Sequence, residues 1–259
     1  MGANTDRSEK RRKFLRGIGE IVLGVLIALA LGAVATSIGW ALDVRSAKQA
    51  IGEELGEILG QGQERQRIYP CFERKFAAIA QILTQADETG RLPPLGPIGN
   101  PVWRTWSHNV WDSTIGSDTA SHFDRGTLDN ISGVYEFVTT MNRSSDQEQD
   151  AWRRLYAMVG PGRAIDKREV ANLRDALSSA RFANRIMAAS AVRMEQITKA
   201  FDLPVNSDTV AQYGNTPINR YCSPIAAPDG SPYGEAPMGN TFEGVKADPI
   251  TKESTGMSK

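Results

Sequence analysis

Histidine and cysteine are scarce in this chain, which has two of each among its 259 residues. Neither His108 nor His122 stands at a recognised metal-ligand spacing. Cys-x-x-Cys pairs, His-Glu-x-x-His, Gly-x-Ser-x-Gly and glycine-rich phosphate loops are also missing. Ser107, His108 and Asp112 are only neighbours in sequence, which is not the geometry of a catalytic triad. The sequence therefore predicts no catalytic residue, no metal site and no cofactor, and we do not expect an enzyme.

An excess of charge of one sign is also absent, because 30 Lys and Arg residues face 30 Asp and Glu residues. Nucleic-acid-binding proteins depend on basic surfaces, so we expect no nucleic-acid partner. Strands with alternating apolar and polar residues are missing too, whereas apolar positions recur with helical spacing. These patterns predict an all-α fold.

The chain does contain one long uncharged run, from Ile21 to Leu42, which covers 22 mostly apolar residues. As a helix it spans roughly 33 Å, enough to cross the hydrocarbon core of a bilayer. Basic residues stay on the cytoplasmic side of a span. Six of them precede this run: Arg7, Lys10, Arg11, Arg12, Lys13 and Arg16. We therefore predict a cytoplasmic N terminus and an exported remainder that has the lipid bilayer as its first partner.

A cleaved signal peptide is the alternative reading of the same segment. The basic start, the apolar core and a small-x-small motif at Ala33–Ala35 are the parts of such a peptide. Apolar character continues past this motif through Ile38, Trp40 and Leu42, which favours an uncleaved anchor. Both readings export the same domain and differ only in whether it stays tethered.

Small residues recur along one face of the predicted span and continue beyond it. Spans associate through small residues, because these let two backbones approach closely. Each glycine in a helix costs about 1 kcal/mol relative to alanine, which suggests a compensating contact with another helix of this chain or of a partner. A flexible linker after the span is the alternative. The helix-packing candidates are Gly24, Ala28, Gly32, Ala35, Gly39, Gly52, Gly56 and Gly60.

We divide the chain into four segments by composition. Residues 1–17 form a cytoplasmic basic segment, 18–42 the transmembrane helix, 43–203 an exported antiparallel helical bundle, and 204–259 an extended tail. The tail holds seven of the 13 prolines and shows no helical period.

Three local signals set the expected helix boundaries within the exported domain. The membrane helix should end near residue 66, because Pro70 interrupts the pattern. Ser145-x-x-Glu148 and Asp166-x-x-Glu169 resemble capping boxes, so each predicts the start of a helix.

Cys71 and Cys222 both follow the predicted span. Two lone cysteines in an oxidising compartment usually pair, and this bridge would close a loop of about 150 residues. We predict this disulfide. Two unpaired thiols are the alternative.

The segment GEIVLGVLIALALG (19–32) resembles a group of uncharacterised bacterial single-span membrane proteins. Their N termini share a basic stretch, Gly-Glu-Ile and an apolar run that ends in Val-Leu-Ile-Ala-Leu. Pro70-Cys71 and the segment 176–186 are similar to members of the same group. The resemblance implies an anchor in the bacterial inner membrane and a periplasmic helical domain, and it implies no activity.

Two functions fit these features. The first is a structural or assembly subunit that contacts a membrane-protein partner, or further copies of itself, through its span and its helical domain. The second is a periplasmic ligand-binding or sensory module. The cytoplasmic segment is too short for a signalling domain, so such a module would need a partner. We favour the first function.

Overall fold

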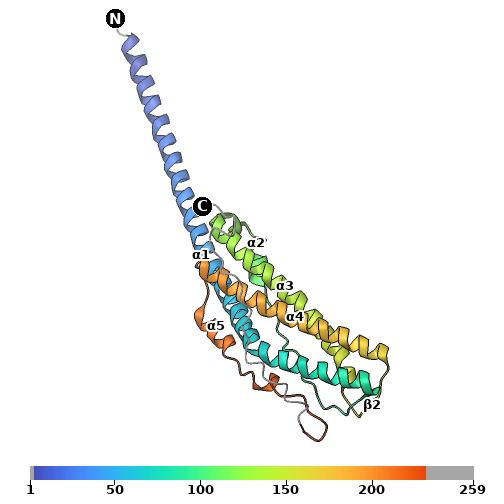
Figure 1. Ribbon diagram of the computed structural model, residues 1–259. Helices are drawn as coiled ribbons and strands as arrows, with labels where there is room; N and C mark the ends of the chain where they lie inside the picture. Colours follow the sequence, from blue (N-terminus) through green and yellow to red (C-terminus); the bar gives the residue numbers. More distant parts are fainter. Residues whose placement is uncertain (1–2, 232–259) are drawn as a thin grey trace.

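The computed structural model describes residues 3–231, and most of them are helical. Helix α1 runs without a break from Ala3 to Thr89, a length of 87 residues. At a rise of about 1.5 Å per residue it is roughly 130 Å long. Figure 1 shows the N-terminal half of α1 projecting away from the molecule, whereas its C-terminal half belongs to a helical domain.

Pro70 lies inside α1 and does not end it, so the predicted break near residue 66 is wrong. A proline in a helix interior costs about 3 kcal/mol, because one hydrogen bond is lost and the ring clashes with the preceding turn. Ile68 and Phe72, on either side, are fully buried, and their packing outweighs this cost. The ribbon changes direction where its colour turns from cyan to teal (Figure 1), as prolines in helices commonly cause.

The rest of the chain adds four helices, two short strands and three 3-10 turns to the described structure. In order they are β1 (Arg91–Leu92), α2 (Asn109–Ile115), η1 (Asp118–His122), α3 (Arg125–Leu155), η2 (Tyr156–Met158), β2 (Arg163–Ala164), α4 (Lys167–Ala200), α5 (Ser207–Gly214) and η3 (Asn219–Tyr221). β1 and β2 pair antiparallel, with Arg91 opposite Ala164. In Figure 1, α3 runs away from the N-terminal side in the same sense as α1, and α4 returns beside them.

Aspartates cap the starts of α3 and α4. Asp166 caps α4 as predicted, because its side chain accepts a hydrogen bond of 2.8 Å from the backbone N–H of Glu169. Asp124 caps α3 in the same way through Thr127. The start predicted at Ser145 is wrong, because Ser145 and Glu148 are both buried within α3.

Two hydrophobic cores follow each other along the domain. The distal core holds an aromatic cluster in which the Phe72 and Trp152 rings lie 5.8 Å apart. The core nearer the N-terminal half of α1 is centred on Trp111 and Tyr135, whose rings stack at 5.0 Å. The buried positions of α1 in this second core include Ile51 and Leu55. The helix that carries the apolar run is therefore also the helix around which the domain is built.

The expectation of an extended tail from residue 204 is wrong for the part that the structure describes. α5 lies within that segment, and Asn206 caps it by accepting from the backbone N–H groups of Asp208 and Thr209. Residues 232–259, which make up the rest of the predicted tail, lie outside the described residues.

Candidate functional site

The apolar run of α1 is exposed from residue 21 to residue 38, and Gly39 and Trp40 near its end are half-buried. Leu26, Leu29 and Val34 are more than half exposed, and no residue from 21 to 38 is buried. The segment is long and apolar enough to cross a bilayer, judged by length and composition. In the described part of the chain, nothing lies within 4 Å of a Cβ placed on Gly24, Gly32 or Gly39. Ala28 and Ala35 lie on the same exposed stretch.

The glycines after the run lie against a helix of the same chain. A Cβ on Gly56 would lie 2.7 Å from the Asn206 carbonyl oxygen, and one on Gly60 would lie 2.6 Å from the Tyr213 Cβ. A Cβ on Gly52 would lie 3.2 Å from the Pro204 carbonyl oxygen. Here small residues let α5 and the segment before it approach the backbone of α1.

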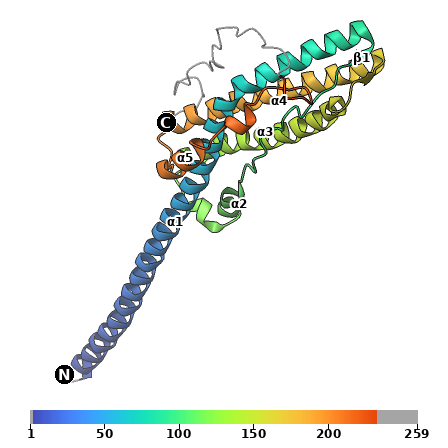
Figure 2. The same ribbon diagram turned by 90° about the horizontal axis from the view of Figure 1, so that it is seen from below.

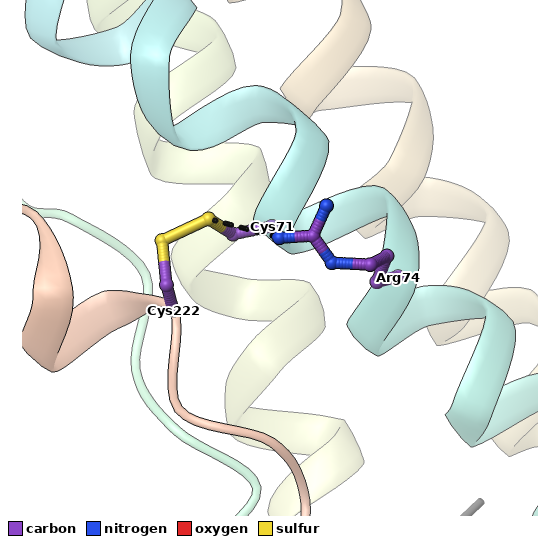
Figure 3. The surroundings of a disulfide bond; sticks show 3 residues. All are labelled: Cys71, Arg74 and Cys222. Carbon is purple, nitrogen blue, oxygen red and sulfur yellow. Dashed lines mark hydrogen bonds between the residues drawn. A yellow bond between two sulfur atoms is a disulfide. The ribbon is translucent and has the colours of Figure 1, made fainter. Parts of the chain in front are cut away.

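Cys71 and Cys222 form a disulfide with a Cα–Cα distance of 5.1 Å, which confirms the predicted pairing. Figure 3 shows Cys71 on α1 and Cys222 on the segment that follows η3. Arg74 donates a hydrogen bond to the Cys71 sulfur at 3.6 Å. The bridge fastens the C-terminal segment to α1 one residue after the proline in that helix.

A chain of polar side chains crosses the middle of the domain, and sequence reasoning missed it. Arg65 on α1 forms an ion pair with Glu148 on α3 and donates to the Asn184 side-chain oxygen on α4 at 2.8 Å. All three are almost completely buried. Burial raises the pKa of the Glu148 carboxyl, and the Arg65 guanidinium opposes that shift. Asn184 then donates to Glu73 at 3.2 Å.

Two buried glutamates on α1 hold the segment that connects α1 to α3. Arg104 donates from Nε and Nη2 to the two carboxylate oxygens of Glu64, both at 2.7 Å. Glu54 accepts from the hydroxyl groups of Ser107 and Tyr135, at 2.9 and 2.6 Å. It also accepts from the backbone N–H groups at the start of α2, both at 3.1 Å.

Successive contacts with α1 define the path of the segment that connects α1 to α3. Arg104 lies beside Glu64 of α1, Ser107 beside Glu54, and further along the chain the His122 ring stacks on Trp40 with ring centroids 4.0 Å apart. The segment therefore runs back along α1 toward the apolar run. Its last turn, η1, lies beside Trp40, near the C-terminal end of that run.

Ser107, His108 and Asp112, the three residues that lie close together in the sequence, do not form a catalytic triad, because Ser107 bonds to a different partner. Ser107 donates to Glu54, whereas His108 Nδ1 lies 2.7 Å from the Asp112 carboxylate, and both His108 and Asp112 are partly exposed to solvent. Among the residues that the structure describes, no three His, Cys, Asp or Glu side chains lie close enough together to hold a metal ion.

No family model, no curated protein and no solved structure matches the chain. The resemblance of its N terminus to bacterial single-span proteins therefore stays a prediction. The described part of the chain is mostly helical and contains one candidate membrane helix and the Cys71–Cys222 disulfide.

Proposed function

We propose that this protein is a single-span, membrane-anchored structural or assembly subunit that acts through protein–protein contacts of its span and its helical domain. The observation that carries the proposal is the continuity of α1, which joins an exposed apolar segment to a buried core without a linker. A rigid connection fixes the distance and the orientation of the domain relative to the bilayer. That geometry suits a structural subunit that positions other proteins at the membrane.

The span itself supports a protein contact. Its glycines at positions 24, 32 and 39 have open space around them, in contrast to the glycines that α5 covers. Close backbone approach is a main source of association between helices in lipid. The partner is either a span of another membrane protein or a second copy of this chain.

We place the protein in the bacterial inner membrane, with its N terminus in the cytoplasm and its domain in the periplasm. The basic residues before the span support this orientation. The disulfide supports an oxidising compartment for the domain. The bacterial assignment rests on the resemblance of the N-terminal segment.

The assembly role is tested by native mass measurement after extraction in mild detergent. We expect a particle heavier than the 28.3 kDa chain. Gly32→Leu should reduce this particle to the single chain, because the added side chain separates the backbones. Val34→Leu, which lies on another face of the same helix, should leave it intact. A wild-type protein that is monomeric throughout would contradict the proposal.

A hollow between α1, α4 and α5 favours a second candidate, the periplasmic ligand-binding or sensory module. It has a volume of about 260 Å³, and its lining includes Leu59, Ala191 and Val210. A metabolite that fits there should raise the melting temperature of the wild type. The same metabolite should not raise the melting temperature of Ser207→Trp, in which the indole fills the hollow from an exposed lining position. A screen without any such metabolite would count against this candidate.

A further inference from the structure

We propose that the Cys71–Cys222 disulfide is a site of thiol–disulfide exchange, at which a dithiol reductant attacks Cys222 and Cys71 is the leaving group. The chain is the substrate of this reaction and not its catalyst, since it lacks the Cys-x-x-Cys pair typical of such catalysts. The inference rests on the surroundings of the bridge. It is independent of the proposed assembly role, so its failure would leave that role standing.

The two cysteines differ in their access to solvent. Cys71 lies on α1 and is buried, with 7% of its surface exposed. Cys222 is half-buried on the segment after η3, and the next two residues, Ser223 and Pro224, are exposed. Figure 1 shows this segment, in orange to red, along the outer edge of the domain, and Figure 2, the view from below, shows it in front of the helices. Because exchange depends on which sulfur an incoming thiolate can reach, the attack is directed to Cys222.

Arg74 makes Cys71 the better leaving group. Its guanidinium donates to the Cys71 sulfur at 3.6 Å, and Figure 3 shows Cys71 between Cys222 and Arg74. Arg65 and Arg104 pair with carboxylates, whereas Arg74 forms no such ion pair in the described part of the chain. A positive charge beside a sulfur stabilises its thiolate, and a stabilised thiolate leaves faster.

The exchange takes two steps and balances in atoms and electrons. In the first, one thiolate of the reductant bonds to the Cys222 sulfur, the bond between the two protein sulfurs breaks, and its electron pair stays on Cys71 as a thiolate beside Arg74. In the second, the other thiol of the reductant attacks its own sulfur in the mixed disulfide, and its proton passes to the departing Cys222. The reductant is oxidised to a disulfide, and the protein bridge is reduced by the same two electrons.

Exchange at this site makes the attachment of the C-terminal segment to α1 reversible. Ile225 in that segment is buried in the distal core, and the Ala226 carbonyl oxygen accepts from the Gly96 N–H at 2.8 Å. Once the bridge is open, only noncovalent contacts of this kind hold the segment. The described helices are not cut by the reaction, so the rest of the domain keeps its core.

The first test treats the full chain in mild detergent with 2-mercaptoethanol, whose only charged form is its thiolate. N-ethylmaleimide blocks the free thiols at early times, and mass spectrometry locates the mercaptoethanol adduct. We expect a rate proportional to the thiol concentration, the adduct on Cys222 and N-ethylmaleimide on Cys71. A rate that does not change with thiol concentration would show that the chain must unfold before the bridge reacts. That result, or an adduct mainly on Cys71, would overturn the proposal.

The second test concerns the leaving group. Arg74→Gln should slow the reduction by at least about threefold, because the departing thiolate loses its charge partner. Arg74→Lys should keep most of the wild-type rate. Arg143→Gln, a matched change at an exposed position of α3, should keep all of it.

A pH profile separates this effect from a structural one. In Cys222→Ser, alkylation of Cys71 by iodoacetamide follows the amount of thiolate. Adding Arg74→Gln to this variant should move the profile to higher pH, and adding Arg143→Gln should leave it in place. Equal reduction rates and equal profiles with and without Arg74 would overturn the assignment of Cys71 as the stabilised leaving group.

Discussion

At the residue scale, the domain depends on carboxylates that sequence reasoning did not predict to be buried. Glu54 and Glu64 look like ordinary polar positions of a helix, and Glu148 was predicted to cap one, yet each of the three is almost completely buried. Their partners are 40 to 83 residues away in the chain. A one-dimensional pattern carries no signal for such pairs, because only the fold brings the partners together.

Substitution of Glu54 tests whether a buried carboxylate stabilises the fold. A glutamine there presents an N–H group to donors that need an acceptor, so Glu54→Gln should lower the free energy of unfolding by at least about 2 kcal/mol. Tyr135→Phe, which removes one of the four donors, should cost less. Thermal unfolding of the detergent-solubilised protein measures both. Equal stability of Glu54→Gln and wild type would show that the buried carboxylate does not hold the connecting segment.

The Arg65–Glu148 pair predicts a pH-dependent defect. Arg65→Met leaves Glu148 buried without its cation, which should cost about 3–5 kcal/mol near neutral pH. Burial raises the pKa of Glu148, so the folded chain binds this proton more tightly than the unfolded chain. Stability then falls as the pH rises above the usual carboxyl value of 4.5.

The defect of Arg65→Met should therefore be smaller at about pH 5 than at about pH 8. The double variant Arg65→Met/Glu148→Met should recover most of the loss, because an apolar pair can replace a buried ion pair. Denaturation curves at the two pH values give the comparison. A defect that does not change with pH, together with an unrepaired double variant, would contradict this explanation.

At the scale of elements, local signals predicted part of the fold. The helical class, the cap at Asp166 and the disulfide are confirmed. The boundaries at Pro70 and Ser145 were wrong, because tertiary packing outweighed a helix breaker at the first and buried the supposed cap at the second. α5 was missed because a helix of eight residues, which lies between Pro204 and Pro217, is too short to show a clear period.

The contact between α1 and α5 gives a matched pair of glycine substitutions. Alanine is the better helix former by about 1 kcal/mol, so Gly133→Ala in α3, where a Cβ meets no atom within 4 Å, should stabilise the protein. Gly60→Ala places its methyl group against Tyr213 and the Val210 carbonyl oxygen. The overlap should cost about 1–3 kcal/mol and outweigh the gain.

Hydrogen exchange should locate the Gly60→Ala effect in α5. Amide protection should fall there and persist in α3 and α4. If Gly60→Ala stabilised the chain as much as Gly133→Ala, α5 would not be packed on α1 as described.

At the scale of the whole molecule, one helix joins the candidate span to the domain, and one disulfide ties the far part of the sequence to that helix. Removing both sulfurs in Cys71→Ser/Cys222→Ser should lower stability by about 2–5 kcal/mol. The segment from η3 onward should lose its protection from exchange first, because the bridge holds it on α1. An unchanged melting temperature and protection pattern would show that the bridge adds nothing to the fold.

The central claim is that α1 fixes the chain in a membrane and places the domain on the exported side. The most direct measurement is the activity of alkaline phosphatase, an enzyme that folds only after export, fused to the C terminus of the full chain in bacteria. We predict an active fusion that stays in the membrane fraction after alkaline washing. An inactive, cytosolic fusion would contradict the orientation, and an active fusion released from the membrane would contradict the anchor.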